Sequence, residues 1–183
     1  MILALVGAGC GTTDGDERAR ELYRAYRSAE DQRDGAEARL RRAFGDIAAA
    51  AETRDRGSSL AAVERGRAAV TDIDRLLSRE LEAALGLEAF EDVSREAGRL
   101  GQGIRTTRAS LRLFSRELDI AALDPFLEDK ANVDEIRRLA RRAAKLAVTG
   151  ELDIRRADRA IAVALGLEPR VDRGLDAETT TGR

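Results

Sequence analysis

A regular stripe of apolar and small residues constrains this chain more than any other feature. Along residues 90–118 the stripe recurs at spacings that alternate between three and four, without a slip over four heptads. Helices with this period pack lengthwise against one another, so the stripe predicts coiled-coil-like helix packing. Its members are Phe90, Val93, Ala97, Leu100, Ile104, Thr107, Leu111, Phe114 and Leu118.

Two similar stripes precede it. The first predicts a helix over 17–54 and is interrupted only by Arg33, and the second predicts a helix over 59–85. Gly86 and Leu87 follow the second stripe in the order typical of a Schellman stop. Three long helices are therefore expected, joined by short turns that force them to run up, down and up.

Two shorter helices are expected near the C-terminus. A capping-box pattern over 132–135 opens one over 133–148, which Gly150 closes, and a second covers 154–165. The sequence VALGLE at 163–168 repeats the glycine stop of AALGLE at 83–88. The prediction is an all-α, elongated antiparallel bundle of three long helices, with the two shorter ones closing the groove between them.

The composition argues against several functions. The chain has no histidine, so it lacks the usual general base and the commonest transition-metal ligand. Its 32 basic and 34 acidic residues are interspersed, for a net charge of −2, which gives no field for nucleic acid. The carboxylates, Glu80 among them, form no metal-binding motif and are expected on solvated faces. No catalytic residue, metal or cofactor is predicted.

The chain begins MILALVGAGC, an apolar or small run that is too short to span a bilayer. It could be a signal-peptide core, a buried or frayed segment, or the start of a glycine-rich nucleotide loop. The nucleotide loop fails on spacing, because Thr12 stands where the fingerprint needs its third glycine.

The residues LVGAGC resemble the lipobox of bacterial lipoproteins, although Gly7 stands where that class usually has Leu. The resemblance implies that Cys10 is lipidated on its sulfur, and that Ala8 and Gly9 are the small residues before the signal-peptidase cut. Residues 1–9 would then be a signal-peptide remnant and 10–16 would be a lipidated cysteine with a flexible tether. The bundle would occupy 17–167, and 168–183, which has no apolar period, would be a disordered tail.

The sequence RRLARRAAK gives the expected fourth helix a basic flank that could touch an anionic surface, although an ordinary polar face would look the same. The flank consists of Arg137, Arg138, Arg141, Arg142 and Lys145.

Two functions from different classes fit these features. The first is a lipid-anchored, non-enzymatic helical-bundle protein of the bacterial cell envelope, on the periplasmic or extracellular face of a membrane. Its role would be structural or protein-binding, with another envelope protein or an anionic polymer as partner. The alternative is a soluble intracellular helical adaptor or oligomerisation module whose N-terminus is merely apolar.

Overall fold

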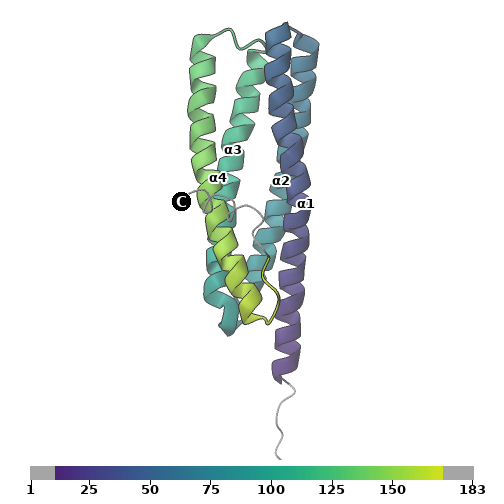
Figure 1. The fold of residues 1–183 in the computed structure, drawn as a ribbon, viewed down its shortest axis with the longest axis vertical. Coiled ribbons are helices and arrows are strands. Elements are labelled where there is room, and N and C mark those ends of the chain that lie inside the picture. The colour runs from purple at the N-terminus through teal and green to yellow at the C-terminus, as the bar shows by residue number, and fades with distance from the viewer. Residues whose placement is uncertain (1–10, 171–183) are drawn as a thin grey trace, which may run out of the picture.

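The computed structural model describes residues 11–170, with side chains from Asp14 onward. It contains four helices, α1 (Gly11–Thr53), α2 (Arg56–Leu87), α3 (Glu91–Leu123) and α4 (Lys130–Ala164), and the described residues form no strand. The helices run antiparallel in an elongated rod (Figure 1). The predicted all-α helical bundle is confirmed. No helix in the described range is long and apolar enough to cross a membrane.

The core follows the predicted stripes. Tyr26, Leu77, Leu100, Ile104 and Leu118 are fully buried, and the heptad positions of three helices face one another along the rod. Leucine, isoleucine and alanine dominate because helices that pack at small crossing angles need such side chains at the contact. The hydrophobic stripes therefore determine which faces turn inward.

The predicted pair of short C-terminal helices is wrong. They form the single helix α4, which continues through Gly150. A methyl group on Gly150 would lie 2.9 Å from the carbonyl oxygen of Gly103 and 2.5 Å from Thr107 Oγ1. Gly150 therefore serves a close approach between α4 and α3. Gly103 makes the matching approach from the other side, since a methyl group there would lie 2.9 Å from the Gly150 carbonyl oxygen.

The two similar glycine segments differ in structure. Gly166 has a φ of +66°, and the Leu167 amide donates to the Ala162 carbonyl at 2.8 Å, so α4 ends in a Schellman motif as predicted. Gly86 is not a stop, because α2 continues to Leu87. A methyl group there would meet Leu22 of α1 at 3.1 Å. Gly86 therefore allows close packing of α2 against α1.

The other boundaries shift by a few residues. The expected flexible tether over 11–16 lies inside α1, where Asp14 places a negative charge in the first turn. Arg56 opens α2 behind Asp55, whose carboxylate accepts a hydrogen bond from the Ser58 amide at 3.0 Å. The expected capping box at 132–135 also lies inside a helix, because Asp129 caps α4.

Packing along the rod follows the chain order: α1 packs on α2, α2 on α3 and α3 on α4, whereas α1 and α4 barely approach each other. The exception is the end of the rod at the bottom of Figure 1, where α4 leans toward α1. We call this the closed end, residues 14–33 of α1 with 151–164 of α4. The open end comprises residues 34–53 of α1 and 130–150 of α4.

Candidate functional site

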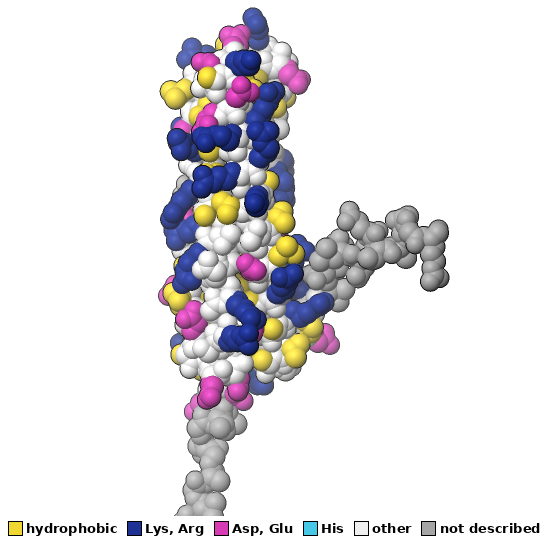
Figure 2. Space-filling model, turned by 90° about the vertical axis from the view of Figure 1, so that its left-hand side faces the viewer, with side chains coloured by type: hydrophobic (Ala, Val, Ile, Leu, Met, Phe, Trp, Pro, Cys, Tyr) yellow, Lys and Arg dark blue, Asp and Glu magenta, His cyan; other side chains and the backbone are white. Residues whose placement is uncertain are grey.

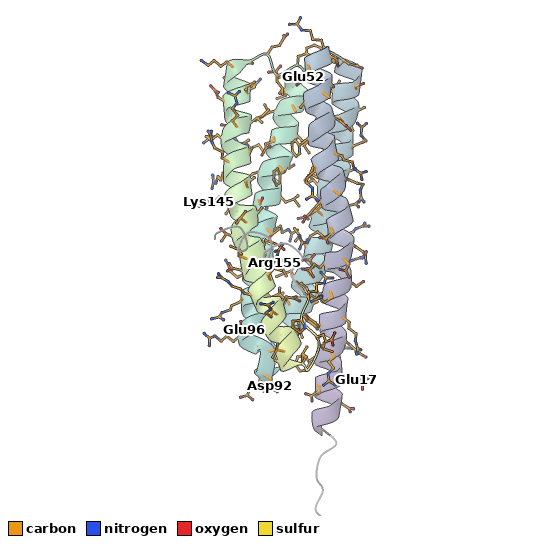
Figure 3. All side chains as sticks on the ribbon, viewed as in Figure 1. Glu17, Glu52, Asp92, Glu96, Lys145 and Arg155 are labelled. Atoms are coloured by element: carbon orange, nitrogen blue, oxygen red, sulfur yellow. The ribbon has the colours of Figure 1, made fainter. Side chains whose placement is uncertain are left out.

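The sequence-predicted site residues fall into two groups. Cys10, Ala8 and Gly9 lie outside the described residues, as does the expected tail from residue 171 onward. The five residues of the predicted basic flank, at positions 137, 138, 141, 142 and 145 of α4, are all exposed, on the side of the helix opposite the buried Leu139 and Ala143. Lys145 extends from the outer flank of the bundle (Figure 3).

A polar cluster at the closed end joins α1 to α4. The Tyr23 hydroxyl donates to Asp158 Oδ1 at 2.7 Å, and Arg27 Nη1 donates to Asp158 Oδ2 at 2.7 Å. Arg27 also lies 5.6 Å from the centre of the Tyr23 ring and donates to its hydroxyl at 2.8 Å. Because burial and the neighbouring Asp158 disfavour the phenolate, the pKa of Tyr23 is raised. The three groups satisfy one another and fix the two helices together.

A second buried contact lies six residues beyond Arg27 along α1, nearly two helical turns further. Arg33, 3% exposed, donates from Nε to Glu80 Oε1 of α2 at 2.8 Å and also pairs with Glu37. Arg33 Nη2 lies 4.0 Å from Glu151 of α4. The residue that interrupts the first apolar stripe is therefore buried within a set of carboxylates from three helices.

Glu80 is the most perturbed acid of this set. Burial raises its pKa to about 7, despite the Arg33 charge, which lowers it. Its Oε2 has no hydrogen-bond partner, and neither has the buried hydroxyl of Tyr26. A carboxyl group of this kind could exchange a proton near neutral pH, but Glu80 is 0% exposed. No substrate can therefore reach it in this conformation, and its contacts hold α1 against α2.

Glu117 of α3 is buried without any counter-charge. It is 4% exposed, its Oε1 has no partner, and desolvation raises its pKa to about 7. An isolated carboxylate in such a place favours its protonated form. Glu117 thus makes the fold sensitive to pH near neutrality.

An apolar groove of about 630 Å³ lies between α1 and α4, beyond the point where the polar cluster ends. Its apolar lining comes from all four helices: Leu40, Phe44, Ile73, Leu111, Phe114, Ala147 and Val148. Phe44 and Phe114 face each other with ring centres 5.9 Å apart. Charged side chains of both signs surround it: Arg33, Asp34, Glu37, Arg41, Glu151 and Arg155. The two shorter helices expected to close this space form the single helix α4, which leans toward α1 only at the closed end (Figure 1).

The outer face of α4 has a different character from the groove. Figure 2 shows basic side chains along this face, with apolar side chains among them and few acidic ones. Arg137 and Arg138 pair with Asp134 and Glu135 on their own helix. In the described part of the chain no ion pair forms with Arg141, Arg142 or Lys145.

Sequence reasoning missed most of the buried polar residues. Glu80 was expected on a solvated face, and this prediction is wrong: it shares a seven-residue spacing with the buried Ser59, Gly66, Ile73 and Leu87. That spacing, together with Arg33 in the facing stripe, could have indicated the pair. The partnership of Tyr23 with Asp158 spans 135 positions, and no local pattern predicts it.

In the described residues no group of three His, Cys, Asp or Glu side chains is arranged to hold a metal ion. Comparisons with protein-family models, with curated proteins and with solved structures found no match to this chain.

Proposed function

We propose that this protein is a lipid-anchored, non-enzymatic binding protein of the bacterial cell envelope, which receives a helix of another envelope protein in its α1–α4 groove. The anchor rests on the lipobox-like residues that end at Cys10. Lipidated and cleaved before that cysteine, the chain would be attached to the periplasmic or extracellular face of a membrane. Two or three acyl chains would make the attachment lasting.

The groove is the observation that carries the binding role. Its two walls are helices that run antiparallel with a gap between them, so a further helix fits lengthwise between them. Phe44 and Phe114 line the groove with aromatic surface, and Ala147 leaves room for a close approach. Burial of such side chains supplies most of the free energy of helix-in-groove binding.

The rim of the groove favours a polypeptide over a lipid or an anionic polymer. The charged side chains that line the groove are three acidic and three basic ones: Asp34, Glu37 and Glu151 with Arg33, Arg41 and Arg155. A rim of both signs matches the mixed charges that flank the apolar stripe of an amphipathic helix. An anionic ligand would meet repulsion from half of these groups.

The polar cluster supports a structural role for the closed end. The side chains of Arg27, Arg33 and Asp158 are occupied by one another or by neighbouring carboxylates. Their contacts hold α1 against α4 and against α2 where the groove ends. The site therefore favours binding over chemistry.

The anchor is tested by fractionation of bacterial cells that express the wild type or Cys10→Ser. The wild type is expected in the membrane fraction, with Cys10 as its N-terminal residue and acylated by mass spectrometry. Cys10→Ser is expected in the soluble fraction. Identical distribution of the two proteins, with the cysteine unmodified, would show that the anchor proposal is wrong.

The groove is tested separately, with a photo-reactive amino acid at position 148 and envelope extracts in mild detergent. A cross-linked partner is expected, with the cross-link inside a helical segment of that partner. The same cross-link should disappear when Ala147 is changed to Glu. A matched probe at Leu123, which is exposed on α3, should not form it. An unchanged cross-link in the Ala147→Glu variant would contradict the groove proposal.

The runner-up function is a soluble intracellular adaptor. The groove is equally compatible with this function, because none of its lining residues requires a membrane. The fractionation experiment separates the two functions, because only the envelope protein needs the acylated cysteine.

A further inference from the structure

The outer face of α4 combines charge and exposed apolar surface in one stripe. Val148, Leu152 and Val163 are 61%, 40% and 63% exposed, and they are three of the five large hydrophobic side chains that the described surface exposes. Basic residues separate and flank them at helical spacing. The stripe reads Arg141, Lys145, Val148, Leu152, Arg156, Arg159 and Val163.

The charge on this face is of one sign over most of its length. Between Glu135 and Glu151, α4 has five basic residues and no acidic one. Arg141, Lys145 and Arg156 form no ion pair with any residue in the described range. Cations that form no ion pair within the described range are available for an external anion, and several of them together give a field that attracts an anionic surface.

We infer that the outer face of α4 binds lengthwise on an anionic lipid bilayer. Arginine and lysine would contact the phosphate groups, while Val148, Leu152 and Val163 would enter the boundary between headgroups and acyl chains. An anionic polymer could use the basic residues but would gain nothing from the three exposed apolar side chains. Val148 also lines the groove, so it lies at the border between this face and the groove. The rest of the groove's lining on α4, Ala147, Glu151 and Arg155, lies on the neighbouring side of the helix.

This face also determines how an anchored rod would lie, a point that rests on the proposed lipid anchor. Arg33 and Glu151 lie at the same height, with 4.0 Å between their charged atoms. Arg33 follows Gly11 by 22 residues of α1, about 33 Å along the helix axis. The basic residues before Glu151 lie farther still. An upright rod would hold them several Debye lengths, of about 8 Å each, from the membrane, so contact of this face with the bilayer requires the rod to lie flat.

Vesicle co-sedimentation of the unlipidated full chain, Cys10→Ser, tests the face without the anchor. Binding is expected to vesicles of phosphatidylcholine and phosphatidylglycerol in equal parts, with much weaker binding to pure phosphatidylcholine, and should fall as NaCl rises. Equal binding to both vesicles, or binding to neither, overturns the inference. Binding of soluble polyglutamate without binding of vesicles would also overturn it and would identify the face as a polymer site.

Two pairs of matched variants locate the binding. The triple change Arg141→Glu, Arg142→Glu and Lys145→Glu should weaken binding by at least about 100-fold. The control triple Arg42→Glu, Arg105→Glu and Arg112→Glu changes the net charge equally on other faces and should have a far smaller effect. Loss of binding in both triples to the same extent would contradict the assignment of α4.

The apolar half of the stripe has its own pair. Val148→Ser with Leu152→Ser should weaken vesicle binding by about 10-fold, whereas Leu85→Ser with Leu123→Ser, at exposed sites elsewhere, should not. Circular dichroism at the same temperature verifies that all variants are folded. Unchanged binding in the first pair would show that the face holds an anionic surface by charge alone, and so would contradict insertion into a bilayer.

Discussion

At the closed end of the rod, α1 and α4 are joined by side chains that reach across, and at the open end they are not. The closed end has Tyr23 and Arg27 on Asp158, and Arg20 donates to the Leu165 carbonyl at 3.1 Å. The open end has Ala147 and Val148 on one wall and Phe44 on the other, with the groove between them. The two ends share the same pair of helices, so the backbone path alone does not decide whether they meet.

The comparison shows how a single contact between α3 and α4 can set the position of α4 at both ends of the rod. The crossing of Gly103 and Gly150 brings α4 against α3 in the middle of α4. On one side of that crossing α4 leans to α1 and is held by the polar cluster, and on the other it stays away (Figure 1). The contacts at the closed end therefore hold α4 in place, while the groove at the open end stays uncovered and can bind a partner.

The largest effect is expected from a change that damages the core shared by both ends. Leu111 is 5% exposed and also lines the groove. Leu111→Asp would bury an unpaired carboxylate and should cost at least about 4 kcal/mol, enough to unfold the bundle. Thermal melting by circular dichroism measures it, with Leu123→Asp, at an 85% exposed site of the same helix, as control. A cooperative melt of Leu111→Asp near that of the wild type would show that the heptad assignment is wrong.

A smaller loss is expected when only the closed end is opened. Asp158→Ala removes the carboxylate that the buried Tyr23 hydroxyl and the partly buried Arg27 guanidinium share, which should cost about 2–4 kcal/mol in urea denaturation. At the open end, Asp134→Ala removes only an exposed partner of Arg137 and should cost less than about 0.5 kcal/mol. Equal losses of unfolding free energy in the two variants would mean that the polar cluster does not hold α1 and α4 together.

Two buried acids, Asp158 of the closed end and Glu117 of α3, also differ in their surroundings. Asp158 has partners, whereas Glu117 has none and its pKa is raised to about 7. The native state therefore retains a proton that an unfolded glutamate, with a pKa near 4.5, has already lost. The stability that this proton provides is present in full below pH 4.5 and is lost as pH rises through 7.

Urea denaturation should therefore give a free energy of unfolding about 1–3 kcal/mol lower at pH 8 than at pH 5. Glu80, whose pKa is also about 7, contributes in the same direction. Glu117→Gln keeps the shape without the charge, so it should be more stable than the wild type at pH 8 and less dependent on pH. A Glu117→Gln profile that parallels the wild type would show that Glu117 ionises freely in the native state.

The smallest effect concerns the glycine crossing. Gly150→Ala would place a methyl group 2.9 Å from the Gly103 carbonyl oxygen and should destabilise the bundle by about 1–2 kcal/mol. Gly45→Ala, in α1 where nothing lies within 4 Å of the new methyl group, should instead stabilise it by about 0.5–1 kcal/mol. Thermal melts of both variants measure the difference. If both changes stabilised the bundle, the close approach at Gly150 could not be the reason why α4 leans toward α1.

The sequence predicted the helical class and the faces of α1, α2 and α3, because the heptad stripes record which residues must be buried together. It did not predict the continuity of α4. Glycine at Gly150 and at Gly86 allows a close approach, whereas Gly166 ends a helix, and the choice depends on a neighbouring helix that the local sequence does not contain. The same limit applies to the site. The position of Arg33 in an apolar stripe indicates a buried charge, but its partner Glu80 belongs to another helix and could not be identified from the local sequence.

The order in which the helices pack has a consequence for folding. Each helix meets its successor through a short connection, so most of the native topology has low contact order and can form fast. The Tyr23–Asp158 bridge instead closes a loop of 135 positions, whose entropic cost is met only after the rest is in place. We expect this bridge to form last and to open first, so amide exchange with solvent should begin where α1 meets α4.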